Sequence, residues 1–217
     1  MSREFDGATQ LLTLASAVVT TAPYTFAAWI RLDVVNALQA PIAIHKSSDP
    51  NNVATALNLM PDGTMRAWSS STLAGAGATS TTTVSASTWT HVCGVWAAAD
   101  SRSVFINGTD KQTNTTSVTP LLLDTTQIGR YDLTTQYLDG LVAEAAIWSV
   151  ALDDAEVASL AKGFSPPLVR PQSIAAYWPL FGNASPEPDR WKNRSDMTVT
   201  GATKADHTRM YYPHDMS

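Results

Sequence analysis

The sequence predicts an all-β protein of antiparallel strands with one short helix, and three observations lead to this fold class. Thr (27) and Ser (20) together make up about a fifth of the 217 residues, while only 15% of the residues are charged. Short strand-like runs follow one another, separated by turn residues. No segment of about 20–50 residues repeats, which argues against propellers and solenoids. A closed or two-sheet antiparallel fold remains, since such folds reach roughly 200–250 residues as one unit.

We expect a single domain over residues 1–217. Hydrophobic residues make up 44% of the chain, enough for a sizeable core, which excludes intrinsic disorder. The core is expected at residues 3–180, followed by a polar loop and a C-terminal extension at residues 181–217.

The expected strands are rich in β-branched and aromatic residues, and several are apolar on both faces, as in stacked layers. In chain order they cover Glu4–Leu14, Tyr24–Asp33, Val53–Met60, Thr64–Ser70, Thr88–Ala98, Arg102–Ile106, Asp110–Val118, Leu121–Leu123, Thr126–Ile128, Tyr137–Trp148 and Ile174–Leu180. Leu73–Ser87 consists almost entirely of Gly, Ala, Ser and Thr, and it fits either a small-residue strand or a loop.

Local signals mark two hairpins and the helix. Pro61-Asp62-Gly63 is a turn sequence, because Pro presets φ and Gly accepts a positive φ. Asn107-Gly108 is the strongest short hairpin signal. Asp153, with Glu156 three residues later, forms a capping box, and Gly163 supplies a stop. One short helix near residues 153–162 is therefore expected.

Charge and hydropathy exclude several classes of protein. Fourteen basic against 19 acidic residues, a net charge of −5, argue against a nucleic-acid partner. No window approaches the roughly 20 apolar residues of a membrane span, so no membrane insertion is expected. The start, Met1-Ser2-Arg3-Glu4, lacks the pattern of a secretion signal. Cys93 is alone and lies in a strand-like run, which predicts a buried, inert thiol and no internal disulfide.

Five stretches, in this order, resemble the laminin-G-like, or concanavalin A-like, jelly-roll family in its bacterial and phage form. They are Phe5-Asp6-Gly7, residues 24–30 (YTFAAWI), residues 89–92 (WTHV), residues 104–108 (VFING) and residues 128–130 (IGR) followed by residues 138–144 (LDGLVAE) and 147–153 (IWSVALD). The last is the most specific, because it is similar to a conserved-looking acidic stretch that precedes the family's small helix. The resemblance implies an antiparallel β-sandwich of the jelly-roll type.

The same stretch bears on metal binding. Where the family pattern has a second acid, this chain has Ala143, although Glu144 is retained. Calcium needs six to eight oxygen ligands, and the chain offers only scattered candidates such as Asp6, Asp33, Asp139 and Glu144. Calcium is possible on the resemblance but is not supported by the residues, so we predict no metal and no cofactor.

The C-terminal part resembles a segment that often precedes the first strand of the family. It runs from Ala176-Tyr177-Trp178-Pro179-Leu180 through residues 196–202. The chain is therefore similar to a circularly rearranged member, or to one module with the opening of a second. We expect the strand at residues 175–180 to pair with, or lie beside, the strand at residues 4–14.

The fold implied by the resemblance includes glucanases and lyases, so catalysis has to be considered. A retaining glycosidase needs two carboxylates about 5–5.5 Å apart, and no Glu-x-Asp-x-Glu pattern, which would line acids along one face of a strand, occurs in the sequence. A lyase would need His, Tyr and Arg to converge, and only four His are present. We predict no catalytic residues, and a polysaccharide hydrolase or lyase is the least favoured alternative.

Sugar binding requires an accessible aromatic ring with polar groups nearby. Trp68 precedes a serine run, and Trp191 lies in a polar loop with Asn193. Tyr131 begins a polar turn at residues 131–137. We name Trp68, Tyr131, Trp191 and Asn193 as candidate carbohydrate-binding residues. The alternative for Trp191, that its ring only covers an edge of the sandwich, stays open.

The function favoured by the resemblance is that of a non-catalytic structural or accessory protein of a virion, such as a phage head decoration or tail-associated surface protein that mediates adhesion. Its partners would be a capsid or tail protein, a cell-surface glycan, or both, and its assembly would occur in the host cytoplasm. A stand-alone lectin-like, carbohydrate-binding module is the alternative. Tyr211 and Tyr212 are candidates for docking on another subunit of a homo-oligomer, or for packing on their own domain.

Overall fold

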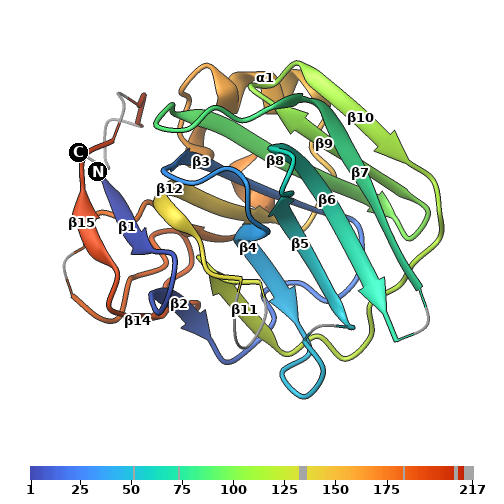
Figure 1. Cartoon of the computed structure of the whole chain (residues 1–217), viewed down its shortest axis with the longest axis horizontal. Helices are drawn as coiled ribbons and strands as arrows, with labels where there is room; N and C mark the ends of the chain where they lie inside the picture. The colour runs from blue at the N-terminus through green and yellow to red at the C-terminus, as the bar shows by residue number, and fades with distance from the viewer. Residues whose placement is uncertain (51, 73, 132–135, 183, 208–209, 213–217) are drawn as a thin grey trace.

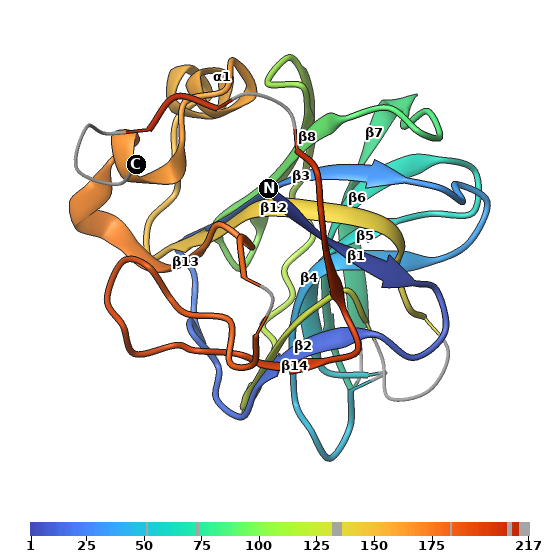
Figure 2. The ribbon, with the colours of Figure 1, turned by 90° about the vertical axis from the view of Figure 1, so that its left-hand side faces the viewer.

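The predicted all-β class is confirmed by the computed structural model, in which two antiparallel sheets, here called sheet A and sheet B, pack face to face (Figure 1). The structure describes residues 1–50, 52–72, 74–131, 136–182, 184–207 and 210–212. In Figure 2, α1 (Asp154–Ala161) lies on one side of sheet A and β4 to β7 lie on the other. None of the helices in these described ranges has the length and apolarity needed to cross a bilayer.

Sheet A is centred on β12, which pairs with β3 along one edge and with β1 and then β13 along the other. Its strands, in spatial order, are β10 (Asp110–Asn114), β9 (Ser101–Ile106), β8 (Thr90–Ala98), β3 (Tyr24–Leu32), β12 (Asp139–Trp148), β1 (Ser2–Asp6) and β15 (Thr203–Ala205), with β13 (Ile174–Trp178) on β12.

Sheet B is the second layer of the sandwich. Its strands, in spatial order, are β14 (Thr198–Thr200), β2 (Leu11–Leu14), β11 (Thr125–Ile128), β4 (Gln39–His45), β5 (Ala54–Leu59), β6 (Thr64–Ser71) and β7 (Ala74–Thr83). The inner faces of both sheets form the main core, with Phe26, Ile42, Leu57 and Trp96 among its members.

The local signals of the sequence are confirmed. The Asp153 side chain accepts from the Glu156 amide at 2.9 Å, and the Glu156 carboxylate accepts from the Asp153 amide at 2.8 Å, so the capping box starts α1. Gly63 adopts φ +84° in the β5–β6 hairpin. Asn107 and Gly108 both have positive φ where β9 turns into β10.

The single strand expected at residues 4–14 is wrong, because the chain changes sheets there. Gly7 has φ +69°, and the Asp6 carboxylate accepts from the backbone amides of Ala8, Thr9 and Gln10. This turn separates β1 in sheet A from β2 in sheet B.

The strand β4 was not predicted from the sequence. It runs through the centre of sheet B although it contains Pro41, which cannot donate to a ladder. Its register against β5 shifts between Gln39 and Ile42, so the proline sits at the irregularity where a donor is not needed.

Three other boundaries differ from the prediction. Residues 121–123 do not form a strand, because Leu122 has φ +61° and is 75% exposed. The strand expected at residues 110–118 is shorter and ends at Asn114. The Asn114 side chain accepts a hydrogen bond from Arg102. The small-residue segment, for which the sequence fits either a strand or a loop, contains the strand β7.

The C-terminal strands complete both sheets. β15 pairs with β1 and β14 with β2, as Figure 2 shows. β13 pairs with β12 in line with β1, so the predicted pairing of residues 175–180 with residues 4–14 is replaced by this end-to-end arrangement. The buried Arg3 guanidinium holds the region together through Glu187 at 2.7 Å and the carbonyls of Ala184 and Ala202.

Candidate functional site

The outer face of sheet B has a floor of small side chains. Ala43 on β4 pairs with Ala56 on β5, and this row is bounded by Gln127 on β11 and Trp68 on β6. Directly paired residues on antiparallel strands project to the same face. Ala40, Ala43, Ala54 and Ala56 are all buried and form, with Tyr131, a hydrophobic cluster separate from the main core. We call this face the alanine floor.

A stacked pair of side chains borders the alanine floor. The Arg66 guanidinium carbon lies 4.0 Å from the centre of the Trp68 ring, a cation–π geometry. Both side chains lean over β7, where Gly75 and Gly77 leave them room. A Cβ on Gly75 would lie 2.4 Å from the Trp68 ring, and one on Gly77 would lie 2.6 Å from Arg66. The glycines of β7 therefore fit this stack.

Two polar side chains beside the stack lack partners. Asn58 pairs with Arg66 across β5 and β6, is fully buried, and has no hydrogen bond on either side-chain atom. Within the described part of the chain, Arg66 has no ion pair and its buried Nε has no acceptor. Burial lowers the pKa of Arg66, and the nearby Tyr131 opposes that effect. Buried polar groups of this kind are uncommon in folded proteins and call for an explanation.

The other flank is formed by the segment after β11. Tyr131 is 6% exposed and packs on the alanine floor. Arg130 donates to the Tyr137 hydroxyl at 3.0 Å and to Gln127 at 3.3 Å. Burial lowers the pKa of His45, whose imidazole borders the floor on β4, and so disfavours its charged form. Residues 132–135 of the predicted polar turn lie outside the described residues.

The structure brings together only two of the four candidate carbohydrate-binding residues. Trp68 and Tyr131 meet on the alanine floor. Trp191 packs instead against the hydrophobic cluster on the outer face of sheet A, the opposite side of the sandwich. Asn193 is exposed, has φ +51°, and donates its amide to the Asp189 carbonyl in the same loop. Trp68 and Trp191 therefore cannot contact one ligand.

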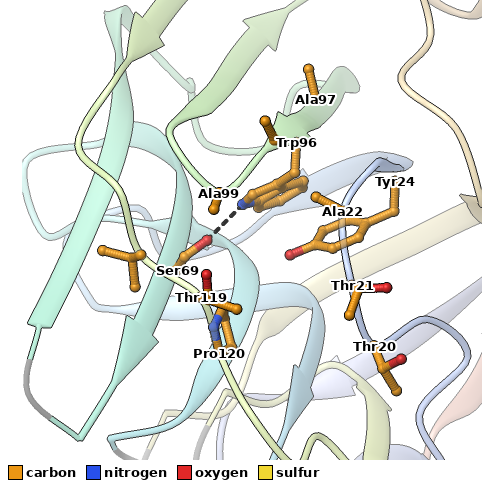
Figure 3. Close-up of a pocket in the computed structure, with 12 residues that line it drawn as sticks. Thr20, Thr21, Ala22, Tyr24, Ser69, Trp96, Ala97, Ala99, Thr119 and Pro120 are labelled. Atoms are coloured by element: carbon orange, nitrogen blue, oxygen red, sulfur yellow. Dashed lines mark hydrogen bonds between the residues drawn. The ribbon is translucent and has the colours of Figure 1, made fainter.

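A separate cavity of about 290 Å³ opens at one end of the sandwich, between residues 20–22 and 118–120 (Figure 3). Its two aromatic side chains have their polar atoms paired. Trp96 Nε1 donates to Ser69 Oγ at 2.9 Å, and the Tyr24 hydroxyl donates to Thr55 at 3.0 Å. The rest of the polar lining comes from Thr20, Thr21 and Thr119.

The C-terminal tail packs on its own domain along sheet A. Tyr211 exchanges backbone hydrogen bonds with Gly163 and Ser165, while its ring is 53% exposed. The Tyr212 hydroxyl donates to one oxygen of the buried Glu144, and Tyr177 donates to the other at 2.6 Å. Burial raises the pKa of Glu144 to about 7, against the opposing effect of both tyrosines. A subunit-docking role for Tyr211 and Tyr212 stays a prediction.

The acidic residues considered as calcium ligands fall into two places. Asp6, Asp33 and Asp139 lie near one another. Burial raises the pKa of Asp139, and the charges of Asp33 and Asp6 raise it further. Asp6 is already engaged in capping its own turn. Glu144 is held by the two tyrosines. In the described ranges, no group of three or more His, Cys, Asp or Glu is placed to hold a metal ion.

The residues that sequence reasoning missed are Arg66 and Asn58. Arg66 stands two positions before Trp68, so both project to one face of a strand. The alternating glycines Gly75 and Gly77 on the next strand were a second signal, because they predict large side chains lying across them.

Three solved structures share the fold. A heptameric SAP-like pentraxin from Limulus polyphemus aligns with a TM-score of 0.61 at 14% identity, over 93% of this chain and 92% of that one. Domain 4 of the arabinanase AbnA from Geobacillus stearothermophilus, in complex with arabinotriose, gives 0.62 at 21% identity, over 74% and 76%. The CBM40 of Ruminococcus gnavus IT-sialidase, bound to alpha2,3 sialyllactose, gives 0.60 at 12% identity, over 74% and 98%.

A comparison with curated protein sequences finds no match. Residues 6–158 match the family model described as the concanavalin A-like lectin/glucanases superfamily, which agrees with the two-sheet jelly roll and with the resemblance of the sequence. The matched range includes the strands of the alanine floor and ends within α1. The chain belongs to the concanavalin A-like lectin/glucanases superfamily.

Proposed function

We propose that the chain is a non-catalytic carbohydrate-binding module whose ligand lies on the alanine floor of sheet B. The observation that carries this proposal is the buried, unpartnered amide of Asn58 beside the unpaired guanidinium of Arg66. Such groups cost stability when they are left unmatched, by about 1–3 kcal/mol each for buried polar groups. A ligand with hydroxyl groups would supply the missing partners.

The shape of the face supports the same function. Sugar rings have apolar faces and polar rims, so they suit a small-residue floor with aromatic walls and a few amide or guanidinium groups. The alanine floor has Trp68 on one flank and Tyr131 on it. Because Tyr131 covers part of the floor, a ligand would have to rotate this ring aside to reach Asn58. Two structures of the same fold were solved with oligosaccharides, arabinotriose and sialyllactose.

The absence of catalysis in the proposal rests on the composition of the floor. The described outward-facing residues of β4, β5, β6 and β7 in the floor rows are Ala, His, Asn, Ser, Trp, Arg, Gly and Thr, without a carboxylate. A retaining or inverting glycosidase uses a pair of carboxylates. Binding without cleavage is the chemistry that these residues can perform.

The virion role stays a prediction that rests on the resemblance to the phage branch. It comprises assembly in the host cytoplasm, attachment to a capsid or tail protein, and a homo-oligomer. It is compatible with carbohydrate binding, because an adhesion protein of a particle needs an accessible ligand face. It adds the requirement that the outer face of sheet B remains uncovered in the assembled particle.

A glycan array followed by calorimetry with the best-bound oligosaccharide tests the proposal. Trp68→Ala removes the ring on which Arg66 stacks, so we expect the affinity to fall about tenfold, since a partly desolvated cation–π contact is worth roughly 1–2 kcal/mol. Trp191→Ala is the matched control on sheet A and should leave the affinity within about twofold. No bound glycan, or a loss caused by Trp191→Ala alone, contradicts the proposal.

A further inference from the structure

Arg66 is a cation without a counter-charge in an acidic protein. The net charge of the chain is −5, and the two fully buried arginines each make several bonds, as Arg3 does with Glu187 and Arg102 does with Asn114 and two carbonyls. Arg66 is half-buried and, among the described residues, has no hydrogen-bond acceptor and no carboxylate within ion-pair distance. A desolvated guanidinium is stabilised when an anion binds it.

The stacking geometry leaves the right donors free. A guanidinium that lies on an indole ring keeps its N–H groups in its own plane, pointing outward from the stack. These paired donors match the two oxygens of a carboxylate in a bidentate arrangement. The guanidinium carbon lies 4.0 Å from the centre of the Trp68 ring, and the stem of Arg66 lies over Gly77 of β7, which holds this group beside the alanine floor.

Asn58 narrows the chemistry of the anion. It lies directly across from Arg66 and carries both an amide donor and a carbonyl acceptor, neither of them used. A free sulfate ion offers only acceptors, so Asn58 Oδ1 would remain unmatched. A sugar acid offers a carboxylate next to hydroxyl groups, which supplies an acceptor for Arg66 and donors for Asn58 at once.

We propose that the alanine floor selects a glycan that carries a carboxylate, a uronic or a sialic acid, with the carboxylate on Arg66 and a neighbouring hydroxyl on Asn58. This inference rests on the proposed carbohydrate-binding function and names its ligand class. The uncharged part of the sugar ring lies over the alanines, and Trp68 acts through Arg66 as a positioning residue.

Paired ligands that differ only in the acid test the inference by calorimetry on the full chain. The first pair is trigalacturonate and its methyl ester, and the second is 3′-sialyllactose and lactose. We expect at least one acidic member to bind about 10- to 100-fold more tightly than its neutral partner, the range for a charge-assisted bidentate contact. The pair that shows the difference identifies the source of the carboxylate.

Two arginine variants separate a local contact from general charge. Arg66→Gln should abolish the preference for the acid, so that the acidic and the neutral member of the pair then bind with affinities within about threefold of each other. Arg194→Gln removes the same charge from the exposed loop that follows Trp191 and should change neither affinity. Because Arg66 makes no ion pair in the described residues, Arg66→Gln should fold normally, which an unchanged melting temperature and circular dichroism spectrum will show.

The outcomes distinguish this inference from the function on which it rests. Equal affinities within both pairs, with binding that Trp68→Ala abolishes, overturn the carboxylate assignment and leave the carbohydrate-binding function intact. Equal losses with Arg66→Gln and Arg194→Gln also overturn it, since they indicate a long-range charge effect. If no member of either pair binds and the glycan array is empty, both the inference and the proposed function are wrong.

Discussion

The two outer faces of the sandwich differ in how they treat buried polar groups. On sheet A, the helix, the 3-10 turns at Pro166–Leu168 and Pro171–Ser173 and the C-terminal tail cover a large hydrophobic cluster. Polar atoms beneath this cover are mostly paired, as Trp148 Nε1 is with the Val169 carbonyl. On sheet B, four alanines, one tyrosine and a stacked Trp68–Arg66 pair surround an amide with no partner.

The outer face of sheet A also has buried polar atoms without partners among the described residues, namely Trp29 Nε1, His91 Nδ1, Ser165 Oγ and both ring nitrogens of His207. The His207 ring packs against Trp29 and Trp89. Trp29 and His91 line a void of about 10 Å³ beneath the tail. A space of this size holds about one water molecule and no sugar. The comparison teaches that the outer face of sheet A is covered by its own chain, whereas the described residues leave the Asn58 amide and Arg66 Nε on sheet B without hydrogen-bond partners.

Two tryptophan truncations test most directly whether the two faces differ in their contribution to stability. Trp148 is fully buried under the cover of sheet A, so Trp148→Ala should lower the free energy of unfolding by about 3–5 kcal/mol. Trp68 is half-buried on an open face, so Trp68→Ala should cost about 1–2 kcal/mol. Urea denaturation with a common m-value measures both. Similar losses would show that the face of sheet B is as much a part of the core as the face of sheet A.

The same contrast explains which parts of the fold could be predicted from the sequence. Signals that act over a few residues, such as the capping box of Asp153 and Glu156 or the Asn107-Gly108 turn, were correct because the chemistry is local. Strand β4 was missed because Pro41 reads as a breaker, and only its bulge in the centre of sheet B accommodates it. The partners of β13 to β15 depend on contacts across the whole chain, which no local pattern encodes.

The next prediction concerns Glu144, the polar centre of the closed face. Burial raises its pKa from 4.5 in the unfolded chain to about 7. The folded state therefore holds a proton that the unfolded state has lost, so this contribution to stability is complete below about pH 4.5 and is lost as pH rises through about 7. The loss amounts to about 3 kcal/mol at 1.36 kcal/mol per pKa unit.

A difference measurement isolates this carboxyl from its neighbours. Burial lowers the pKa of His91 and of His207 to about 3, so these imidazoles make the protein more stable as pH rises to about 6.5, the opposite sign. Glu144→Gln keeps the size of the side chain and an acceptor for Tyr177 and Tyr212. The stability of wild type minus that of Glu144→Gln should fall between pH 5 and pH 8 in urea titrations. A flat difference would contradict the raised pKa.

The candidate site was predictable in part, and the reason is again physical. Trp68 and Tyr131 were chosen as aromatic residues in polar surroundings, and both lie on the alanine floor. Trp191 was chosen by the same criterion, but its ring packs on the cluster under the cover of sheet A, because its polar loop folds back over β13. Asn58 was not noticed, since a buried amide with no partner is visible only after the strands are aligned.

The smallest expected effect is a gain in stability, caused by a substitution of Asn58. Asn58→Leu replaces a buried, unpartnered amide by an apolar side chain of similar size, so the free energy of unfolding should rise by about 1 kcal/mol, because the amide no longer has to be desolvated. Glycan binding should be lost at the same time. A side chain kept at the expense of stability is typical of a binding site.

A matched substitution on the same strand should lower the free energy of unfolding. Thr55 is also fully buried on β5, but its side chain faces the main core and accepts from the Tyr24 hydroxyl at 3.0 Å. Thr55→Val leaves that hydroxyl without its partner and should lower the free energy of unfolding by about 1–2 kcal/mol. If Asn58→Leu also lowers stability, the amide has a structural role, and the two faces of β5 do not differ in the way the structure indicates.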